Sequence, residues 1–144
     1  METAESFQGL RGVALSLVQH GQLTREQAID AADSAARERV PLISHLVKHK
    51  VVPAREIAST FAVTYGLPLL DLEAVDLESL PTNLADKDLI RRHRAMPLAQ
   101  RAQRLFIGVS DPSNLKGIEE LRFHTGLIPE LVLVEDDKLD KFID

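Results

Sequence analysis

The sequence predicts an α+β fold, with an N-terminal four-helix subdomain over residues 1–66 and a small α/β subdomain over residues 67–144. Three observations predict it. Apolar residues recur at helical spacing through the first part. Short β-type runs alternate with helical patterns in the second part, which we expect to hold a three- to four-stranded sheet. Gly66 lies where the pattern changes, and Gly is common just past a helix end.

The first subdomain contains a degenerate tandem repeat. The segment LVQHGQLTREQAIDA, which begins at Leu17, resembles LVKHKVVPAREIAST, which begins at Leu46. The matched pairs are Leu17 with Leu46, Val18 with Val47, and His20 with His49. A unit that cannot bury its apolar face alone often does so against a second copy of itself. Two copies are too few for a solenoid, so the repeat predicts a paired helical module, a type that binds partners more often than it catalyses reactions.

Each of the four expected helices has a start or stop signal. The first, over Phe7–Val18, is followed by Gly21, which suits a helix end. The second opens with Thr24, and Gln27 follows three residues later at the spacing of a capping box. The third and fourth open with prolines, which suit a first helical turn, at Pro41 and Pro53.

The second subdomain is expected to alternate strands and helices. Its elements in order are an extended run (67–72), a helix (83–93), two strands around a short polar turn (96–98 and 104–110), a helix (114–125), a strand (128–134) and a short terminal helix (135–144). The terminal helix begins with Glu135, Asp136 and Asp137. Acidic residues are favoured there by the helix dipole, so we expect an ordinary first turn.

Composition limits the function classes. A formal net charge of -5 argues against non-specific nucleic-acid binding. The absence of cysteine excludes disulfides and thiolate chemistry, and it fits a cytoplasmic location. No apolar run approaches the roughly 20 residues of a membrane span, and METAESFQGLRG lacks the layout of a signal peptide. We therefore expect no direct membrane insertion and no nucleic-acid partner.

Catalytic motifs are missing from the sequence. A phosphate loop requires Gly-Lys followed by Ser or Thr, and the pair Gly-Lys does not occur in the chain. Neither a GxGxxG nor a GxSxG motif is present. We therefore expect that this chain alone is not an enzyme and does not hydrolyse ATP.

Histidines at helical spacing raise the question of a metal site. His45 and His49 are four residues apart on one expected helix, as in HExxH zinc sites. However, no Glu follows His45, and no carboxylate lies nearby in sequence to complete a site. The sequence therefore predicts two solvated histidines and no metal.

Two groups of residues outside the expected core are candidates for partner contacts. Arg91, Arg92 and Arg94 form a basic cluster in an acidic chain, and could hold a phosphate or an acidic partner surface. Alternatively, they are only the exposed end of a helix. Leu15 and Ile29 fall outside the main apolar faces of their helices. They either make core contacts or, if exposed together, form a hydrophobic docking patch.

One stretch carries a family resemblance. The segment HRAMPLAQRAQRLFIGVSDPSN, from His93 to Asn114, resembles the N-terminal domain of type II secretion and type IV pilus assembly ATPases, and the tail LVEDDKLDKFID adds to the likeness. The resemblance covers essentially the whole chain. In this family the domain precedes a hexameric ATPase domain, which binds the ATP. It implies a regulatory and docking head in the cytoplasm, at the inner face of the bacterial inner membrane. The implied partners are the ATPase domain of the same chain and the inner-membrane pilus platform.

Many domains of this kind, called MshEN, bind cyclic di-GMP through two tandem motifs that begin Arg-Leu-Gly and end in Gln. This chain departs from that pattern. With the motifs aligned on Gly21, the Arg, Gly and Gln positions hold Gly12, Ala14 and Ala35 in the first motif, and Pro41, Ile43 and Thr64 in the second. We therefore expect no bound cyclic di-GMP. Direct binding through a shifted alignment that uses Arg11 stays an alternative.

The resemblance also implies a partner. Degenerate heads of this kind resemble those that work with a separate PilZ-type adaptor protein, which links cyclic di-GMP signalling to pilus assembly. We expect the adaptor to dock on an apolar patch of the helical subdomain, with the candidate contacts Leu10, Arg11, Leu15 and Ile29. The alternative is a structural connector that packs against the ATPase hexamer or the membrane platform, through the arginine cluster.

Overall fold

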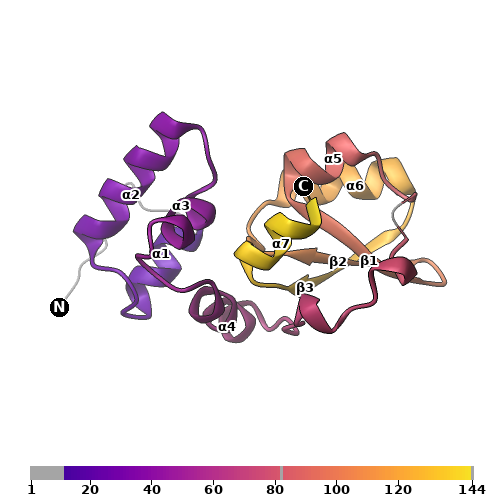
Figure 1. Cartoon of the computed structure of the whole chain (residues 1–144), viewed down its shortest axis with the longest axis horizontal. Coiled ribbons are helices and arrows are strands. Elements are labelled where there is room, and N and C mark those ends of the chain that lie inside the picture. The colour runs from indigo at the N-terminus through magenta and orange to yellow at the C-terminus, as the bar shows by residue number, and fades with distance from the viewer. Residues whose placement is uncertain (1–11, 82, 144) are drawn as a thin grey trace.

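A computed structural model describes residues 12–81 and 83–143 of the chain. Figure 1 shows a group of helices beside a unit of strands and helices. The first group consists of α1 (Gly12–Gln19), α2 (Arg25–Glu38), α3 (Leu42–Lys48) and α4 (Ala54–Tyr65). In the described ranges, no helix combines the length and the apolar character that crossing a bilayer requires. The expected start of the first helix at Phe7 lies outside the described residues.

The helix signals in the sequence act as expected. The hydroxyl of Thr24 accepts a hydrogen bond from the Gln27 N–H at 3.1 Å, and the Thr24 N–H donates to Gln27 Oε1 at 2.9 Å. This reciprocal pair is a complete capping box at the start of α2. Pro53 is the N-cap of α4, and Gly66 ends that helix in the left-handed conformation at φ 65°.

The repeat seen in the sequence is also a repeat of backbone structure. The Gln22 N–H donates to the Leu17 carbonyl at 2.9 Å after α1. The matching bond after α3, from the Val51 N–H to the Leu46 carbonyl, is also 2.9 Å long. Both turns contain a residue with positive φ, Gly21 at 74° and Lys50 at 58°. Each copy is therefore a helix, a left-handed turn and a second helix.

The α/β part consists of α5 (Lys87–His93), β1 (Ala95–Arg101), β2 (Arg104–Val109), α6 (Leu115–Thr125), β3 (Ile128–Leu133) and α7 (Asp136–Ile143), preceded by two single-turn 3-10 helices, η2 (Leu72–Ala74) and η3 (Leu77–Ser79). The three strands form one sheet in the order β1-β2-β3. β1 and β2 are an antiparallel hairpin, and β3 runs parallel to β2 after the crossover through α6. The expected α+β class with a small sheet is thus confirmed.

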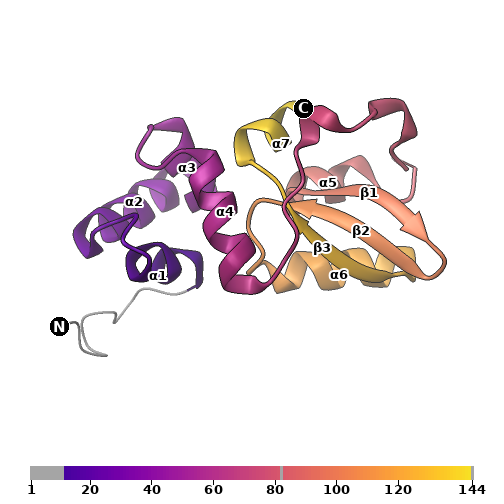
Figure 2. The same cartoon turned by 90° about the horizontal axis from the view of Figure 1, so that it is seen from below.

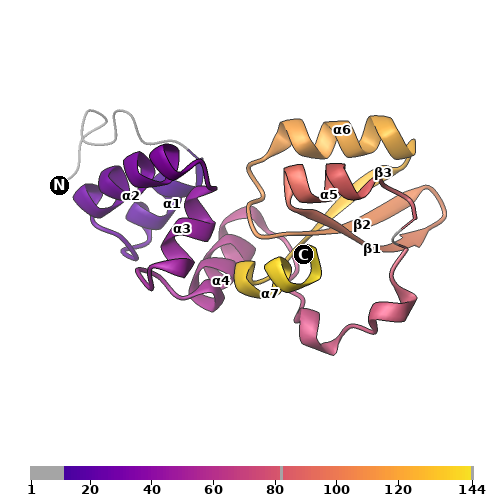
Figure 3. The ribbon, with the colours of Figure 1, turned by 45° about the horizontal axis from the view of Figure 1, so that its top comes forward.

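Helices cover both sides of this sheet. α6 and α7 lie on opposite sides of the strands, and α5 packs beside α6 (Figures 2 and 3). The helix expected over residues 83–93 begins only at Lys87, because the carboxylate of Asp86 caps it by accepting the Asp88 N–H at 3.0 Å.

The extended run expected at residues 67–72 is short of a full strand. It forms one isolated parallel bridge to the end of β3, between Leu69 and Leu133. The Leu70 N–H donates to the Leu133 carbonyl at 2.9 Å, and the Leu133 N–H donates to the Pro68 carbonyl at 2.8 Å. At residue 72 the chain turns into η2, which ends the pairing.

One hydrophobic core joins the two parts. Fully buried members include Leu17, Leu46, Phe61, Leu133 and Leu139. α3 and α4 both contact α7, and α4 also contacts β3. The second copy of the repeat therefore connects the helical part to the sheet, while α1 and α2 pack on its other side, away from the sheet (Figure 2).

Candidate docking surfaces and the arginine cluster

The apolar patch expected on the helical part is half-buried where the structure describes it. Leu15 on α1 and Ile29 on α2 both pack against the core, and both keep part of their surface exposed. Leu10 and Arg11, the other two expected contacts, lie outside the described residues. The expectation of core contacts is therefore confirmed for these two side chains, and a docking patch formed by them stays a prediction.

The outer surface of α2 around Ile29 has an excess of acidic side chains over the exposed cation Arg25, which lies four residues before Ile29. Glu26 and Asp33 are exposed and lie three residues before and four residues after Ile29, so all three share one face of the helix. Asp30, the next residue along the chain, is exposed as well. A partner that contacts Ile29 must therefore meet carboxylates at the edge of the contact.

The positions that align with the Arg, Gly and Gln of the cyclic di-GMP motifs hold other residue types in this chain. Ala14, Ala35 and Ile43 are buried in the structure. Alkyl side chains have no hydrogen-bonding groups, and a buried one is not available to a ligand. Pro41 and Thr64 are exposed. Thr64 hydrogen-bonds to His20 Nε2 at 3.3 Å.

The arginine cluster divides into members with different environments. The Arg94 guanidinium donates to Asp136 Oδ1 at 2.9 Å and pairs with Asp140 Oδ1 at 2.5 Å. Burial alone would lower the pKa of Arg94, but Asp136 and Asp140 outweigh it and raise that pKa above its ordinary value. Asp136 is itself buried and also accepts a hydrogen bond from Ser110 Oγ at 2.6 Å. Arg94 is thus engaged within the chain.

This network corrects one expectation from the sequence. Asp136 was expected to be an ordinary acidic residue in the first turn of the terminal helix. It begins α7 as expected, but its side chain points into the protein and binds Arg94 and Ser110. A buried carboxylate needs such partners, because its burial without them would be costly.

The other two arginines are exposed on α5. Arg91 Nε donates to the Ile143 carbonyl of α7 at 3.5 Å. Arg92 lies on the side of α5 that faces α6 and lines a groove between these two helices. Arg92 is therefore the member of the cluster that lines the groove between α5 and α6.

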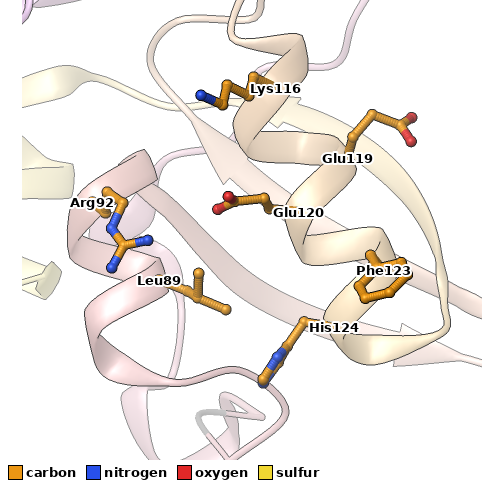
Figure 4. A pocket seen from close by; sticks show the side chains of 7 residues that line it. All are labelled: Leu89, Arg92, Lys116, Glu119, Glu120, Phe123 and His124. Carbon is orange, nitrogen blue, oxygen red and sulfur yellow. The ribbon is translucent and has the colours of Figure 1, made fainter.

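The groove between α5 and α6 has a volume of about 540 Å³ and mixed chemistry. Figure 4 shows Leu89, Arg92 and Glu120 pointing into the space between the helices, while Glu119 and Phe123 lie on the outward side of α6. Phe123 is 94% exposed, so its ring is almost entirely in water. A large exposed aromatic side chain beside a groove is a feature of protein-binding surfaces.

A histidine–carboxylate pair joins α5 and α6 beside this groove, and its carboxylate lines the groove. His93 Nε2, at the end of α5, donates to Glu120 on α6. This hydrogen bond lowers the pKa of Glu120 below its ordinary value. The pair joins the two helices, and its contact keeps Glu120 oriented toward α5 rather than toward solvent.

The family of the chain follows from a match to residues 65–144, which a family description named "MshEN domain" covers. This is more than half of the sequence. The chain belongs to the MshEN domain family.

Curated relatives of this MshEN domain are type IV pilus assembly ATPases called PilB. The chain is 40% identical over 135 residues to PilB of Pseudomonas aeruginosa, an alignment that covers 94% of this chain and 24% of that protein. It is 28% identical over 132 residues to PilB of Acinetobacter baylyi, covering 92% of this chain and 23% of that protein. The chain thus spans about a quarter of the length of the curated relatives it matches.

Solved structures share the fold. A structure of MshE with cdg aligns with a TM-score of 0.66 and 24% identity, over 92% of this chain and 96% of that one. The N-terminal domain of XpsE aligns with a TM-score of 0.70 and 21% identity, over 99% of this chain and 96% of that one. At these identities the likeness shows the MshEN fold alone.

The histidines of this MshEN domain lie only partly as the sequence predicted. His45 is only 7% exposed, and its Nδ1 is 3.3 Å from Glu38 Oε2. His49 is half-exposed, with Nε2 3.9 Å from Glu38 Oε1. The expectation of a solvated histidine is therefore wrong for His45 and confirmed for His49, and the expectation that no carboxylate lies nearby is wrong, because Glu38 approaches both from α2. In the sequence, the short link between α2 and α3 is the signal that could have predicted this contact, because a short link keeps the end of α2 close to α3.

Proposed function

We propose that this MshEN domain is the non-catalytic docking domain of a type IV pilus assembly ATPase, and that it binds a PilZ-type adaptor protein through its helical part. The observation that carries the proposal is the chemistry of the positions that align with a nucleotide site. Ala14, Ala35 and Ile43 are alkyl residues built into the core, so the scaffold is present without the polar groups that would read a nucleotide. The adaptor would then bring cyclic di-GMP regulation from outside.

The likeness to PilB supports the setting of this proposal. We propose that the domain precedes an ATPase domain in the same chain and contacts it, and that it works at the cytoplasmic face of the bacterial inner membrane beside the pilus platform. ATP would be bound only by that motor domain, since the sequence of this chain lacks the Gly-Lys pair of a phosphate loop.

The docking mode combines an apolar centre with a charged edge. Leu15 and Ile29 supply partly exposed apolar surface, and Leu10 and Arg11 precede α1 in the sequence. The exposed carboxylates of Glu26 and Asp33 flank Ile29 on α2. Apolar anchors supply most of the energy of such an interface, and charges mainly steer association. The adaptor surface that meets α2 is therefore expected to be basic.

The test is a titration of the chain with a purified PilZ-type adaptor from the same organism. Substitution of Ile29 or Leu15 by Gln should weaken binding at least tenfold, about 1.4 kcal/mol, because each removes an apolar anchor. Val63→Gln is the matched control, since Val63 is an apolar residue on α4 that is already 82% exposed. Circular dichroism and thermal melting establish that each variant is folded. Unchanged affinity in folded Leu15 and Ile29 variants contradicts the docking mode.

Direct binding of cyclic di-GMP is a second candidate, favoured by the fold that the chain shares with MshE, whose structure was determined with cdg. Calorimetric titration of the chain with cyclic di-GMP separates the two. Saturable binding that Arg11→Ala abolishes supports the direct sensor. Absence of heat with a folded sample supports the adaptor.

A third candidate is a structural connector, favoured by the exposed Phe123 beside the α5–α6 groove. In this case the groove packs against the ATPase hexamer or the platform. Phe123→Ser together with Arg92→Glu would then disturb assembly of the full-length motor, while adaptor binding stays as in the unmodified protein. If assembly is normal in this double variant, the connector function of the groove is refuted.

A further inference from the structure

We propose that Glu38, His45 and His49 form a binding site for a divalent transition-metal ion, with Zn²⁺ as the first ion to test. Each side chain offers one donor atom, and the three atoms lie within 4.8 Å of one another. In a tetrahedral zinc site, bonds of about 2.0–2.2 Å keep the donor atoms roughly 3.3–3.6 Å apart. The closest pair here, His45 Nδ1 and Glu38 Oε2, is already at 3.3 Å.

Local structure brings the three residues together. His45 lies in α3 and His49 is its C-cap, so the two rings are one helical turn apart on the same side. Their ring centroids are 4.3 Å apart, with an angle of 43° between the planes. Glu38 is the last residue of α2, and Arg39 follows in the left-handed conformation at φ 58°. This turn reverses the chain and places the carboxylate against α3.

The donor set selects the class of metal. Two imidazole nitrogens and one carboxylate oxygen suit Zn²⁺ and other first-row transition metals, whereas Mg²⁺ and Ca²⁺ prefer oxygen ligands throughout. Three protein ligands also leave one tetrahedral position for water or for a donor from another molecule. The site therefore differs in type from a closed, four-ligand structural zinc site.

The burial of the three side chains suits an ion that enters from solvent. The His45 side chain is 9% exposed, so packing restrains its ring. The side chains of Glu38 and His49 are 46% and 47% exposed. Rotation of these two can therefore close the remaining distance, while His45 supplies a fixed point. Fixed and adjustable ligands together make a site that is largely formed before the ion arrives.

The proposed site also joins the two copies of the repeat. Glu38 ends the first copy, and the histidines belong to the second. In the first copy, the residues equivalent to His45 and His49 are Ser16 and His20, so that copy has one histidine where the second has two. The site is thus a property of one copy only. It goes beyond the docking function and does not depend on it.

The test is a titration of the tag-free 144-residue chain with ZnCl₂, after treatment with a chelator and its removal. Calorimetry should show saturable binding of about one ion per chain. Co²⁺ is the parallel probe, because its visible absorption intensifies when it moves from water into a tetrahedral site. Glu38→Gln and His49→Ala should each lower the affinity at least tenfold, since each removes one ligand.

The controls keep the proposal falsifiable. His20→Ala is the matched control, because His20 is exposed and is the counterpart of His49 in the other copy, and it should bind Zn²⁺ as the unmodified chain does. His45 is left intact because its burial could make a variant unfold. Absence of saturable binding overturns the proposal. So does unchanged affinity in folded Glu38→Gln and His49→Ala, or an equal loss in His20→Ala, which would show non-specific histidine binding.

Discussion

The two copies of the helix pair share a backbone and differ in what they bury. Ala28 and Ala32 of α2 correspond to Ile57 and Phe61 of α4. Ile57 and Phe61 are fully buried, and α4 contacts α7 and β3 as well as α1 and α3, whereas the main contacts of α2 are with α1 and α3. The larger side chains of the second copy therefore anchor it to the rest of the protein. The first copy leaves part of its surface exposed to solvent, and this difference makes it the better candidate for binding a partner.

The largest expected effect comes from breaking the anchor of the second copy. Phe61→Ala should lower the free energy of unfolding by about 3–5 kcal/mol, because it removes a fully buried aromatic ring and leaves a cavity. Ala32→Gly, at the equivalent position of the first copy, should cost only about 1 kcal/mol, the helix-propensity difference. Urea unfolding measures both. Equal losses in the two variants would mean that the copies do not differ as anchors.

A smaller effect should distinguish the two helix starts. Thr24→Ala removes the capping box of α2 and should cost about 1 kcal/mol of unfolding free energy. Pro53, the equivalent residue, is an N-cap without a side-chain hydrogen bond. Pro53→Ala should therefore cost less, roughly 0.5 kcal/mol, mainly through the greater freedom of the unfolded chain. Thermal melting of both variants shows which substitution destabilises the protein more. A larger loss of stability for Pro53→Ala refutes the capping argument.

The smallest effect concerns the segment that follows the second copy. A hydrogen bond from Lys138 on α7, at 3.1 Å, is the largest cause that lowers the pKa of Asp71, and the backbone N–H of Glu73 adds to it. A lowered pKa in the folded state stabilises the protein above the ordinary carboxyl pKa of about 3.9. That contribution is lost as the pH falls through the lowered value. In the Asp71→Asn variant, the free energy of unfolding should therefore depend slightly less on pH below about 4. Urea unfolding at several pH values measures this dependence. An unchanged dependence would contradict the role of this contact.

Local signals explain most of the fold that the sequence predicted. The capping box at Thr24, Pro53 at the start of α4 and Gly66 at its end each act within one helical turn, so they can be found without knowing the fold. The β1–β2 hairpin is likewise local. The start of α5 was placed too early because the sequence between η3 and Asp86 contains no apolar pattern strong enough to fix the boundary.

The features that the sequence did not predict depend on residues far apart in the chain. The burial of Asp136 depends on Arg94, the C-cap residue that follows α5 and precedes β1. The approach of Glu38 to His45 depends on the turn at Arg39, whose left-handed backbone is unusual for a residue that is not Gly. Periodicity describes one helix at a time, so it carries no information on such pairs. The candidate docking residues remain predictions that only a binding experiment can test.

The short pairing between residues 68–70 and Leu133 has a mechanical consequence. Two backbone hydrogen bonds fasten the segment after α4 to the last residue of β3, just before the chain enters α7. If a partner pulls or tilts the helical part, α4 must either break these two bonds or carry the end of β3 with it. Load applied at one end of the molecule therefore reaches the end of β3 through the backbone at Leu133, in addition to the packing of α3 and α4 against α7.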